Sequence, residues 1–315
     1  MSLVLAMRGI LADARAEQTT PVLFHCSMYG YATRALAFWL QRGFVKWKRE
    51  SPGGPLITMF HELVANGPIW TSPFWLHGIQ RGLIRRFARE STASLTSNAL
   101  YCQQLAQIAG IEESHIVKLP VLSTVGEPGE LPPARARKRQ LVVFGKPHSR
   151  DLAFSGCLPI LASVCRVLGI ERILEVGPGA SEREHRLSAA VEATGALAAD
   201  EVSAILRDSL FGFIASDASL LSKSTVFAAY CAHGTVPIVA GRGGGEADGL
   251  YANQQYLCTP MQASISGDQL EAVSQSAHTW YRGHGVTAQA SQYAGIMDEV
   301  SETCRVTAGK HEGSV

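Results

Sequence analysis

The stretch from Phe213 to Ala240 decides the fold: Phe213-Ile-Ala-Ser-Asp-Ala-Ser-Leu-Leu-Ser-Lys-Ser-Thr-Val-Phe-Ala-Ala-Tyr-Cys-Ala-His-Gly-Thr-Val-Pro-Ile-Val-Ala240. It opens with a short apolar run, passes through a polar loop and continues into a helical segment that Ser222 or Ser224 would cap. Gly234 suits the end of that helix, and a second apolar run follows it. A strand, a helix and a strand in this order predict one βαβ unit of a parallel sheet.

The same alternation of short apolar runs and longer helical patterns continues along the whole chain. Strands are expected at residues 21–26, 56–61, 94–97 and 115–119 in the first half, and at 140–145, 172–177, 211–216, 236–240 and 255–258 in the second. Residues 123–139 are rich in proline, glycine and arginine without a hydrophobic period, which is typical of a linker. We therefore predict an α/β protein of two Rossmann-like lobes, residues 1–134 and 135–315, with parallel sheets flanked by helices.

The composition excludes several classes of protein. With 46% hydrophobic residues among 315, the chain can bury two cores. A formal net charge of +1 gives no overall field that would attract nucleic acid, so no nucleic-acid partner is expected. The seven cysteines contain no C-x-x-C pair and no nearby histidine cluster, which indicates buried thiols and no metal site. No leader-like segment and no run of about 18 apolar residues is found, so a cytoplasmic location is expected.

The start of the central helix has the chemistry of an anion site. A helix N-terminus at Ser224 and Thr225 would present backbone N–H groups with a partial positive charge. Lys223 adds a full positive charge and three hydrogen-bond donors. These groups suit a diphosphate, whereas the alternative is an ordinary βαβ unit with a solvated lysine.

A second basic loop follows the strand expected at residues 140–145. It supplies Gly145, Lys146 and Arg150. Because parallel strands end at the same edge of a sheet, this loop and the one before Lys223 are expected to meet in one crevice. The alternative is an exposed turn with ordinary surface cations.

The first half of the chain offers one further pair of candidates. His61 and Glu62 follow an apolar run directly, which favours a strand end aimed at a cleft. His61 could act there as a general base or a hydrogen-bond partner. A purely structural contact between a histidine and a carboxylate is the alternative.

Residues 72–90 form an amphipathic pattern of helical period. Its apolar residues are Trp75, Leu76, Ile79, Leu83, Ile84 and Phe87, and its other face carries Arg81, Arg85, Arg86 and Arg89. A helix that packs on the core and exposes its arginines is the favoured interpretation. The alternative interpretation is that this helix makes peripheral contact with the inner face of an anionic membrane.

The sequence Ile173-Leu-Glu-Val-Gly-Pro-Gly-Ala resembles the first motif of S-adenosylmethionine-dependent methyltransferases. That motif belongs to the first strand of its domain, whereas this stretch is expected to form the second. Residues 181–193 are expected to be helical and residues 194–200 to form a loop, so no acidic strand end follows. A methyltransferase is therefore the least favoured alternative.

The order of these pieces resembles the GT-B glycosyltransferases, in particular the group 1 family of bacterial polysaccharide and glycoconjugate assembly. The resemblance rests on residues 215–234 with Pro237-Ile-Val, Phe144-Gly-Lys with Arg150, Phe60-His-Glu, and Leu95-Thr-Ser-Asn before a helix. It implies a transferase that moves a sugar from a nucleotide diphosphate sugar to a carbohydrate or lipid-linked acceptor, without a metal or other cofactor. It also implies that Lys223, with Lys146 or Arg150, holds the diphosphate, that Ser224 and Thr225 supply the helix N-terminal donors, and that His61 faces the acceptor hydroxyl or the transferring sugar.

Two features depart from that family's pattern. Retaining members carry two glutamates eight positions apart, and the corresponding residues here are Leu221 and Ala229. The chain also opens with a helical run at residues 3–17 in place of a strand and a glycine-rich loop, which implies an abbreviated N-terminal lobe or a fragment. Both departures leave open a catalytically inactive relative that binds a nucleotide or glycan within a biosynthetic complex.

Overall fold

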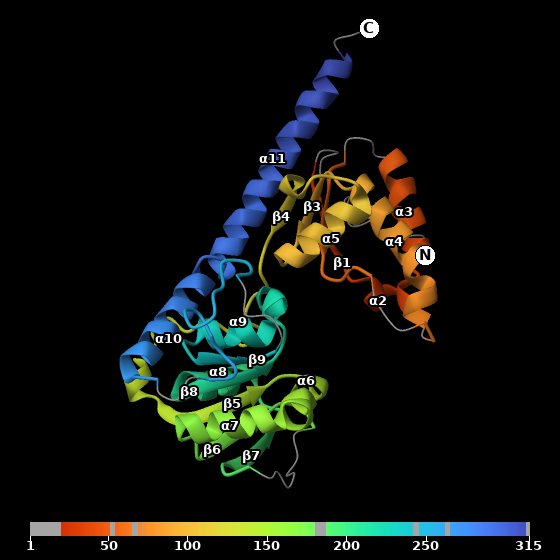
Figure 1. Cartoon of the computed structure of the whole chain (residues 1–315). Helices are drawn as coiled ribbons and strands as arrows, with labels where there is room; N and C mark the ends of the chain where they lie inside the picture. The colour runs from red at the N-terminus through yellow and green to blue at the C-terminus, as the bar shows by residue number, and fades with distance from the viewer. Residues whose placement is uncertain are drawn as a thin grey trace. The chain divides into compact units, whose positions relative to one another are not determined.

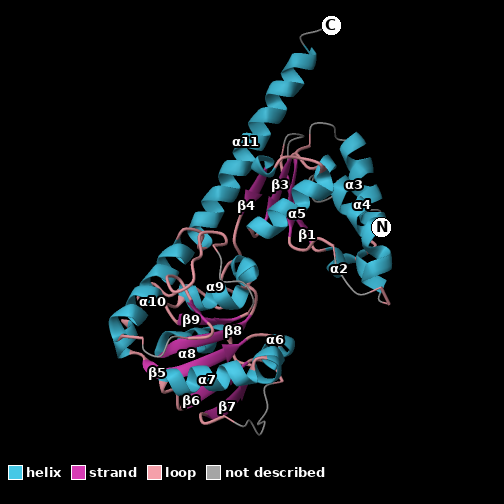
Figure 2. Cartoon of the chain, in the orientation of Figure 1, coloured by secondary structure: helices cyan, strands magenta, loops and turns pink. Residues whose placement is uncertain are grey.

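The computed structural model describes residues 20–50, 54–64, 69–70, 72–179, 187–241, 246–261 and 265–312 (Figure 1). The chain divides into two compact units. Unit 1 comprises Met1–Leu119 and Gln289–Val315, and unit 2 comprises Pro120–Ala288. In Figure 2, each unit contains a sheet with helices against it, as expected for an α/β protein.

Unit 1 is built on a four-stranded parallel sheet whose strands follow one another in chain order. The strands are β1 (Val22–Cys26), β2 (Leu56–Phe60), β3 (Ala93–Thr96) and β4 (Ile116–Lys118). The helical segments between them are α2 (Met28–Tyr31), η1 (Thr33–Ala35), α3 (Phe38–Glu50), α4 (Ser72–Glu90), α5 (Ala99–Ala109) and η2 (Glu113–His115).

Alternate residues of β2 supply the two faces of this sheet. Leu56 and Phe60 join a core cluster with α3, α4 and α5. Ile57 and Met59 point the other way and pack with Val300 of α11 (Val286–Glu312). The period of two in a strand therefore buries both faces, and the last helix of the chain covers the second one.

Unit 2 holds a six-stranded sheet in which all strands are parallel. Its order is β10-β9-β8-β5-β6-β7. The strands are β5 (Lys138–Phe144), β6 (Arg172–Val176), β7 (Ala190–Gly195), β8 (Ser209–Ala215), β9 (Val236–Ala240) and β10 (Leu257–Cys258). This order is that of the doubly wound Rossmann fold, which reverses direction between β5 and β8.

Helices cover both faces of the sheet in unit 2. They are η3 (Ala134–Ala136), α6 (Pro147–Asp151), η4 (Leu152–Gly156), α7 (Leu158–Leu168), α8 (Ala199–Asp208), η5 (Ala218–Lys223), α9 (Thr225–Ala232) and α10 (Gly267–Arg282). One core cluster joins α7 to residues such as Leu141 and Phe211, and a second joins α8 and α9 to residues such as Val142 and Ile214.

All nine expected strands are present, and one further strand was not expected. The helix predicted for residues 181–193 is wrong at its end, because Ala190–Gly195 forms β7. Its Ala-Val-Glu-Ala-Thr-Gly sequence contains two β-branched residues but no aromatic residue and no run of large apolar residues. As an edge strand paired only with β6, β7 owes its conformation to tertiary pairing.

The boundary between the units differs from the predicted split at residue 134. Unit 2 begins at Pro120, so residues 120–134 belong to it and not to unit 1. The Val121 N–H, for example, donates to the Ser222 carbonyl over 2.9 Å. The Tyr281 hydroxyl also donates to Glu127 over 2.6 Å. Apolar contacts hold this segment as well, since Val125 is buried and Val121 is partly buried in a core cluster of unit 2, although the segment has no regular hydrophobic period. The end of the chain returns to unit 1, and the helical run expected at residues 3–17 lies outside the described residues.

None of the described helices alone has the length and apolar character to cross a membrane. The bent pair of Pro147–Gly156 and Leu158–Leu168, with an angle of 76°, passes such a test by length and composition only. Its residues Phe154, Leu161 and Val164 are buried in the core of unit 2, so packing within the unit accounts for their apolar character.

Candidate functional site

The reversal of strand order between β5 and β8 marks the candidate site of unit 2. Ligands of open α/β sheets bind at this point, outside the carboxyl ends of the strands. A cavity of about 110 Å³ lies there. Its lining comes from both strand ends, from α6 and from the start of α9, and comprises Val143, Phe144, Ser149, Phe213, Ile214, Ala215, Ser216, Ser224 and Val226.

Tyr230 of α9 fixes the two strands where they diverge. The Cα register of β5 against β8 runs as far as Val142 and Gly212. Beyond it, the Phe144 N–H donates to the Tyr230 hydroxyl over 3.2 Å, and this hydroxyl donates to the Val142 carbonyl over 3.0 Å. Burial raises the pKa of Tyr230 well above its usual value, so the hydroxyl stays protonated and remains a donor. The floor of the crevice is therefore a hydrogen-bonded junction.

Replacing Tyr230 by phenylalanine is expected to lower the free energy of unfolding by about 1–3 kcal/mol, because buried backbone groups lose their partner. Urea unfolding would measure the change. Tyr251→Phe is the control, since Tyr251 is 39% exposed, and it should change stability by less than about 0.5 kcal/mol. Equal effects of the two substitutions would contradict the role given to Tyr230.

Gly145 brings the first basic loop against the second. Its φ of +133° disfavours any residue with a Cβ, and a Cβ there would lie 3.1 Å from Val226 Cγ2 at the start of α9. The loop after β5 and the start of α9 are thus in close contact, as the sequence predicts. Residues 180–186 and 242–245, which follow β6 and β9 in sequence, lie outside the described residues.

The other predicted diphosphate ligands lie close in the chain to residues that line this crevice, and of them Ser224 lines it directly. Lys146 is exposed at the N-cap of α6, and Lys223 is half-buried at the end of η5. Ser224 caps α9, because its hydroxyl accepts from the Phe227 N–H over 3.2 Å. Thr225 is exposed in the first turn. The arrangement offers two lysines and a capped helix N-terminus to an anion.

Arg150 does not reach the surface, and the prediction that it binds the diphosphate is corrected. Its side chain is fully buried, and its Nε lies 2.9 Å from Glu175 Oε1, whose side chain is also fully buried. The guanidinium further donates to the carbonyls of Gly145 and Pro178. The arginine is therefore a clamp between the loops after β5 and β6.

The ion pair with Arg150 gives a structural role to Glu175, the acidic residue of the stretch that resembles a methyltransferase motif. Glu175 faces Arg150 within the unit, and its other oxygen, Oε2, is buried and has no hydrogen-bond partner among the residues that the structure describes. Its strand, β6, lies next to β5 and not at the reversal between β5 and β8. The acidic residue thus helps to position the loop at Gly145.

In unit 1, His61 and Glu62 follow the carboxyl end of β2, as predicted. His61 Nε2 lies 2.8 Å from Nδ1 of His25, and the two rings stack with centroids 5.1 Å apart. In such a hydrogen bond one ring nitrogen carries the proton and the other accepts it. The pair can therefore take up a proton at one ring and share it with the other.

Further groups surround the two histidines. The Tyr31 hydroxyl donates to the His25 carbonyl over 2.7 Å, and the Ser27 hydroxyl makes a weak 3.5 Å contact with Glu62. Burial, with a smaller contribution from the charge of Glu62, raises the pKa of the Cys26 thiol to about 12. The thiol is therefore protonated at neutral pH and is no nucleophile.

His25 is the site residue that the sequence prediction missed. It stands one position before the end of β1, beside β2, and its Cα is paired with that of Met59. A histidine near the ends of two consecutive strands was the available signal, because neighbouring parallel strands bring such positions to one edge.

The positions where glutamates were expected lie in the core of unit 2. Leu221 and Ala229 are both fully buried and belong to the same apolar cluster. Acidic side chains there would lose solvation without a partner, so this chain places no carboxylate at either point. Any acidic contact with a sugar must come from another segment.

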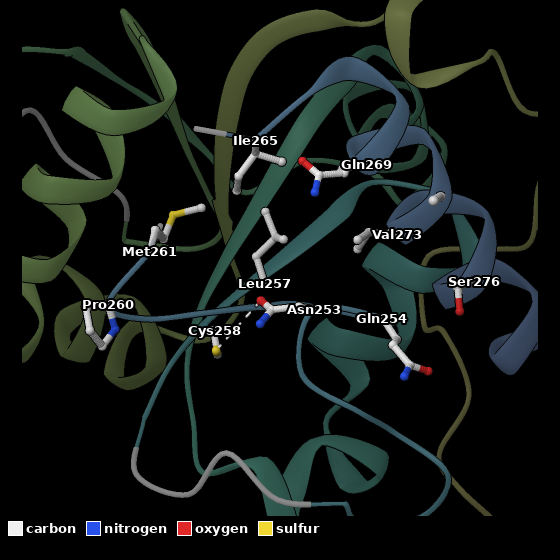
Figure 3. Close-up of a pocket in the computed structure, with 11 residues that line it drawn as sticks. Asn253, Gln254, Leu257, Cys258, Pro260, Met261, Ile265, Gln269, Val273 and Ser276 are labelled. Atoms are coloured by element: carbon white, nitrogen blue, oxygen red, sulfur yellow. Dashed lines mark hydrogen bonds between the residues drawn. The ribbon is translucent and has the colours of Figure 1, made fainter. Parts of the chain in front are cut away.

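A larger cavity, of about 560 Å³, lies at the β10 edge of the sheet (Figure 3). Leu257 and Cys258 line it from β10, and Gln269 and Val273 line it from α10. Its described lining carries amide, hydroxyl and apolar groups but no charged side chain. A dianionic diphosphate would find no cation there, so the smaller crevice at β5 and β8 is the better candidate. Within the described ranges, no three His, Cys, Asp or Glu side chains are grouped as metal ligands.

Comparisons with known proteins bear on the fold. No family model matches the chain, and no curated protein matches it by sequence. Among solved structures, an α,α-trehalose-phosphate synthase (UDP-forming) from Burkholderia vietnamiensis is similar with a TM-score of 0.59 and 11% identity, over 94% of this chain and 75% of that one. A glycosyltransferase from Rickettsia africae has a TM-score of 0.56 and 12% identity, over 95% of this chain and 80% of that one.

A third similar structure is an α-glucosyltransferase in complex with UDP and a 13-mer DNA, with a TM-score of 0.52 and 7% identity. That match covers 88% of this chain and 80% of the other. All three matches extend over most of the chain, including both sheets. The chain therefore has the GT-B fold of glycosyltransferases.

Proposed function

We propose that this protein transfers a glycosyl group from a nucleoside diphosphate sugar to a hydroxyl group of a carbohydrate or lipid-linked acceptor. The observation that carries the proposal is the crevice at the reversal of strand order, where the loop of Gly145 and Lys146 meets the start of α9, which Lys223 directly precedes. Solved structures of the same fold support it, since one is named UDP-forming and another holds UDP.

The crevice suits the charge that develops when the sugar leaves the diphosphate. As the bond between the anomeric carbon and the diphosphate oxygen breaks, the electron pair stays on the leaving group. Lys223 and the N–H groups at the start of α9 would stabilise that charge at fixed positions, and Lys146 would add a second cation. Cations of the chain itself would take the part that a metal plays elsewhere, so the proposed transfer is metal-independent.

The histidine pair of unit 1 suits the acceptor half of the reaction. The acceptor oxygen forms a new bond to the anomeric carbon and must lose its proton. His61 would accept that proton and share it with His25 through their 2.8 Å hydrogen bond. Glu62 lies beside the pair and would orient the acceptor hydroxyl. No carboxylate from α9 is required in this scheme.

Thermal protection by nucleotide sugars tests the proposal. A ligand present at 100 times its Kd should stabilise the protein by about 2.7 kcal/mol. Replacing Lys223 by alanine removes charge-assisted hydrogen bonds worth about 1.5–3 kcal/mol, so affinity should fall by a factor of about ten or more. Melting temperatures measured with uridine, guanosine and adenosine diphosphate sugars would show which base is preferred.

Lys138→Ala is the matched control. Lys138 lies at the opposite, amino end of β5 and makes a surface ion pair with Asp208, so its loss should leave nucleotide protection unchanged. If none of the three families of nucleotide sugar raised the melting temperature, the proposal would be wrong. Protection without turnover on a broad acceptor panel would instead identify a nucleotide-binding relative that has lost activity.

A further inference from the structure

Unit 1 exposes a set of large apolar side chains that we name the aromatic end. Its members are Tyr29, Tyr31, Phe38, Trp39, Ile69, Trp70, Phe74, Trp75 and Ile79. The three tryptophans are the most exposed of its aromatic residues, at 55% for Trp39, 82% for Trp70 and 69% for Trp75. Large aromatic side chains are normally buried for most of their area, so several together on one surface require an explanation.

The topology gathers these residues at one end of unit 1. α2 follows β1 and α4 follows β2, so both helices begin at the carboxyl edge of the sheet. α3 leads back to the amino end of β2, so it also begins at that edge. Contacts agree with this placement, because Gln80 of α4 donates to the Arg34 carbonyl over 2.8 Å and to the Tyr29 hydroxyl over 3.4 Å. Phe74 and Trp75 also pack edge to face, 5.4 Å apart.

The exposure changes along α4 and is not a general property of the helix. Its second half buries Leu83, Ile84 and Phe87 in the core, whereas its first half exposes Phe74 and Trp75. Across the described residues, every tryptophan or phenylalanine classed as exposed lies in the aromatic end. The helix therefore packs on the core at one end and presents rings to the outside at the other.

The charge on the same helices is strongly one-sided. α3 and α4 carry Arg42, Lys46, Lys48, Arg49, Arg81, Arg85, Arg86 and Arg89, against only Glu50 and Glu90 at their last positions. Arg42 and Arg81 are exposed and lie one turn from Trp39 and two turns from Trp75, respectively. Cations beside interfacial aromatic rings match the headgroup region of an anionic bilayer.

We propose that the aromatic end docks unit 1 on an anionic lipid surface. The rings of Trp39, Trp70 and Trp75 enter the boundary between headgroups and acyl chains, and Arg42 and Arg81 bind lipid phosphates. The rings together with the exposed Arg42 and Arg81 suit an anionic bilayer, which takes up aromatic rings and binds cations without needing a matched shape. The surface belongs to unit 1, so the inference stands or falls independently of nucleotide binding in unit 2.

Sedimentation of the full chain with vesicles tests this docking. The chain should bind phosphatidylcholine vesicles that contain phosphatidylglycerol, bind pure phosphatidylcholine vesicles at least tenfold more weakly, and detach as salt is raised. Its tryptophan emission should shift to shorter wavelength on binding. The double variant Trp39→Ser with Trp75→Ser should lose at least tenfold in partitioning and most of the emission shift.

Charge reversal has a matched control in this chain. Arg42→Glu with Arg81→Glu should abolish binding to anionic vesicles, whereas Arg166→Glu with Arg282→Glu, the same change in net charge on exposed residues of unit 2, should retain more of it. Equal loss in both double variants would overturn the assignment to this surface. So would failure of the unsubstituted chain to bind, which would indicate that another segment of the chain covers the aromatic end.

A second copy of the chain is the remaining occupant. If the protein forms a dimer that Trp39→Ser with Trp75→Ser dissociates, and vesicles are not bound, the proposal is wrong and the aromatic end is a dimer interface. Unchanged melting temperatures would show that the variants fold. Retained thermal protection by nucleotide sugars would separate loss of docking from failure of the proposed function.

Discussion

Replacing Arg150 by alanine is expected to lower the free energy of unfolding by about 3–5 kcal/mol, the range for removing one partner of a buried ion pair. Arg150 and Glu175 have no exposed side-chain area, and among the described residues only the guanidinium compensates the carboxylate. The second oxygen of Glu175 has no hydrogen-bond partner among those residues, so the variant would leave the whole carboxylate without a described partner. Urea unfolding followed by circular dichroism measures the loss.

A surface pair supplies the comparison for Arg150. Arg172 lies 2.6 Å from Glu192, and both side chains are about half exposed, at 45% and 54%. Arg172→Ala should therefore cost no more than about 1 kcal/mol. The double variant Arg150→Met with Glu175→Leu should recover much of the loss, because no charge remains buried. If Arg150→Ala were as mild as Arg172→Ala, the clamp would be unimportant.

Gly177→Ala is expected to destabilise unit 2 by about 3 kcal/mol or more, through both backbone strain and overlap. Gly177 has a φ of +143°, and a Cβ there would lie 2.4 Å from the Gly145 carbonyl oxygen and 2.4 Å from Nη1 of Arg150. The carbonyl is backbone and cannot move aside cheaply. The loop at Gly145, which borders the proposed diphosphate site, must shift instead.

Gly179→Ala separates the two contributions. Gly179 lies in the same loop with a φ of +70°, and a Cβ there would meet no atom of the described residues within 4 Å. It should cost only the strain of a positive φ, about 1–2 kcal/mol. Gly177→Ala should additionally weaken thermal protection by a nucleotide sugar, whereas Gly179→Ala should not. Equal stability and equal protection in the two variants would contradict the close approach of the two loops.

Much of the fold could be predicted, because the buried strands of a parallel sheet appear in the sequence as short, continuous apolar runs. β5 and β9 are examples, with Val142 and Ile238 among continuous buried residues. β7 could not be recognised, because its conformation depends on pairing with β6 and not on its own alanine-rich sequence. The end of unit 1 could not be recognised either, because the segment after Pro120 has no regular hydrophobic period although hydrogen bonds and two valines fasten it to unit 2.

In the candidate site, too, some features could be predicted from the sequence and others depend on contacts between distant residues. The contact between Gly145 and the start of α9 followed from topology, because both stand at the carboxyl ends of parallel strands. The burial of Arg150 could not be predicted, since it depends on a carboxylate 25 residues later in the chain that points into the same pocket of the core. From the sequence alone, an arginine in a loop is expected to be solvated, because its buried partner is not identified.

The return of α11 to unit 1 has a consequence for the order in which the chain can fold during synthesis. Unit 2 is continuous in sequence, so a ribosome releases all of it before the residues from Gln289 onward emerge. Until then, Ile57, Met59 and Leu95 lack their contact with the helix that carries Val300. Unit 1 is therefore synthesised first but completed last, because its last helix is made after the whole of unit 2.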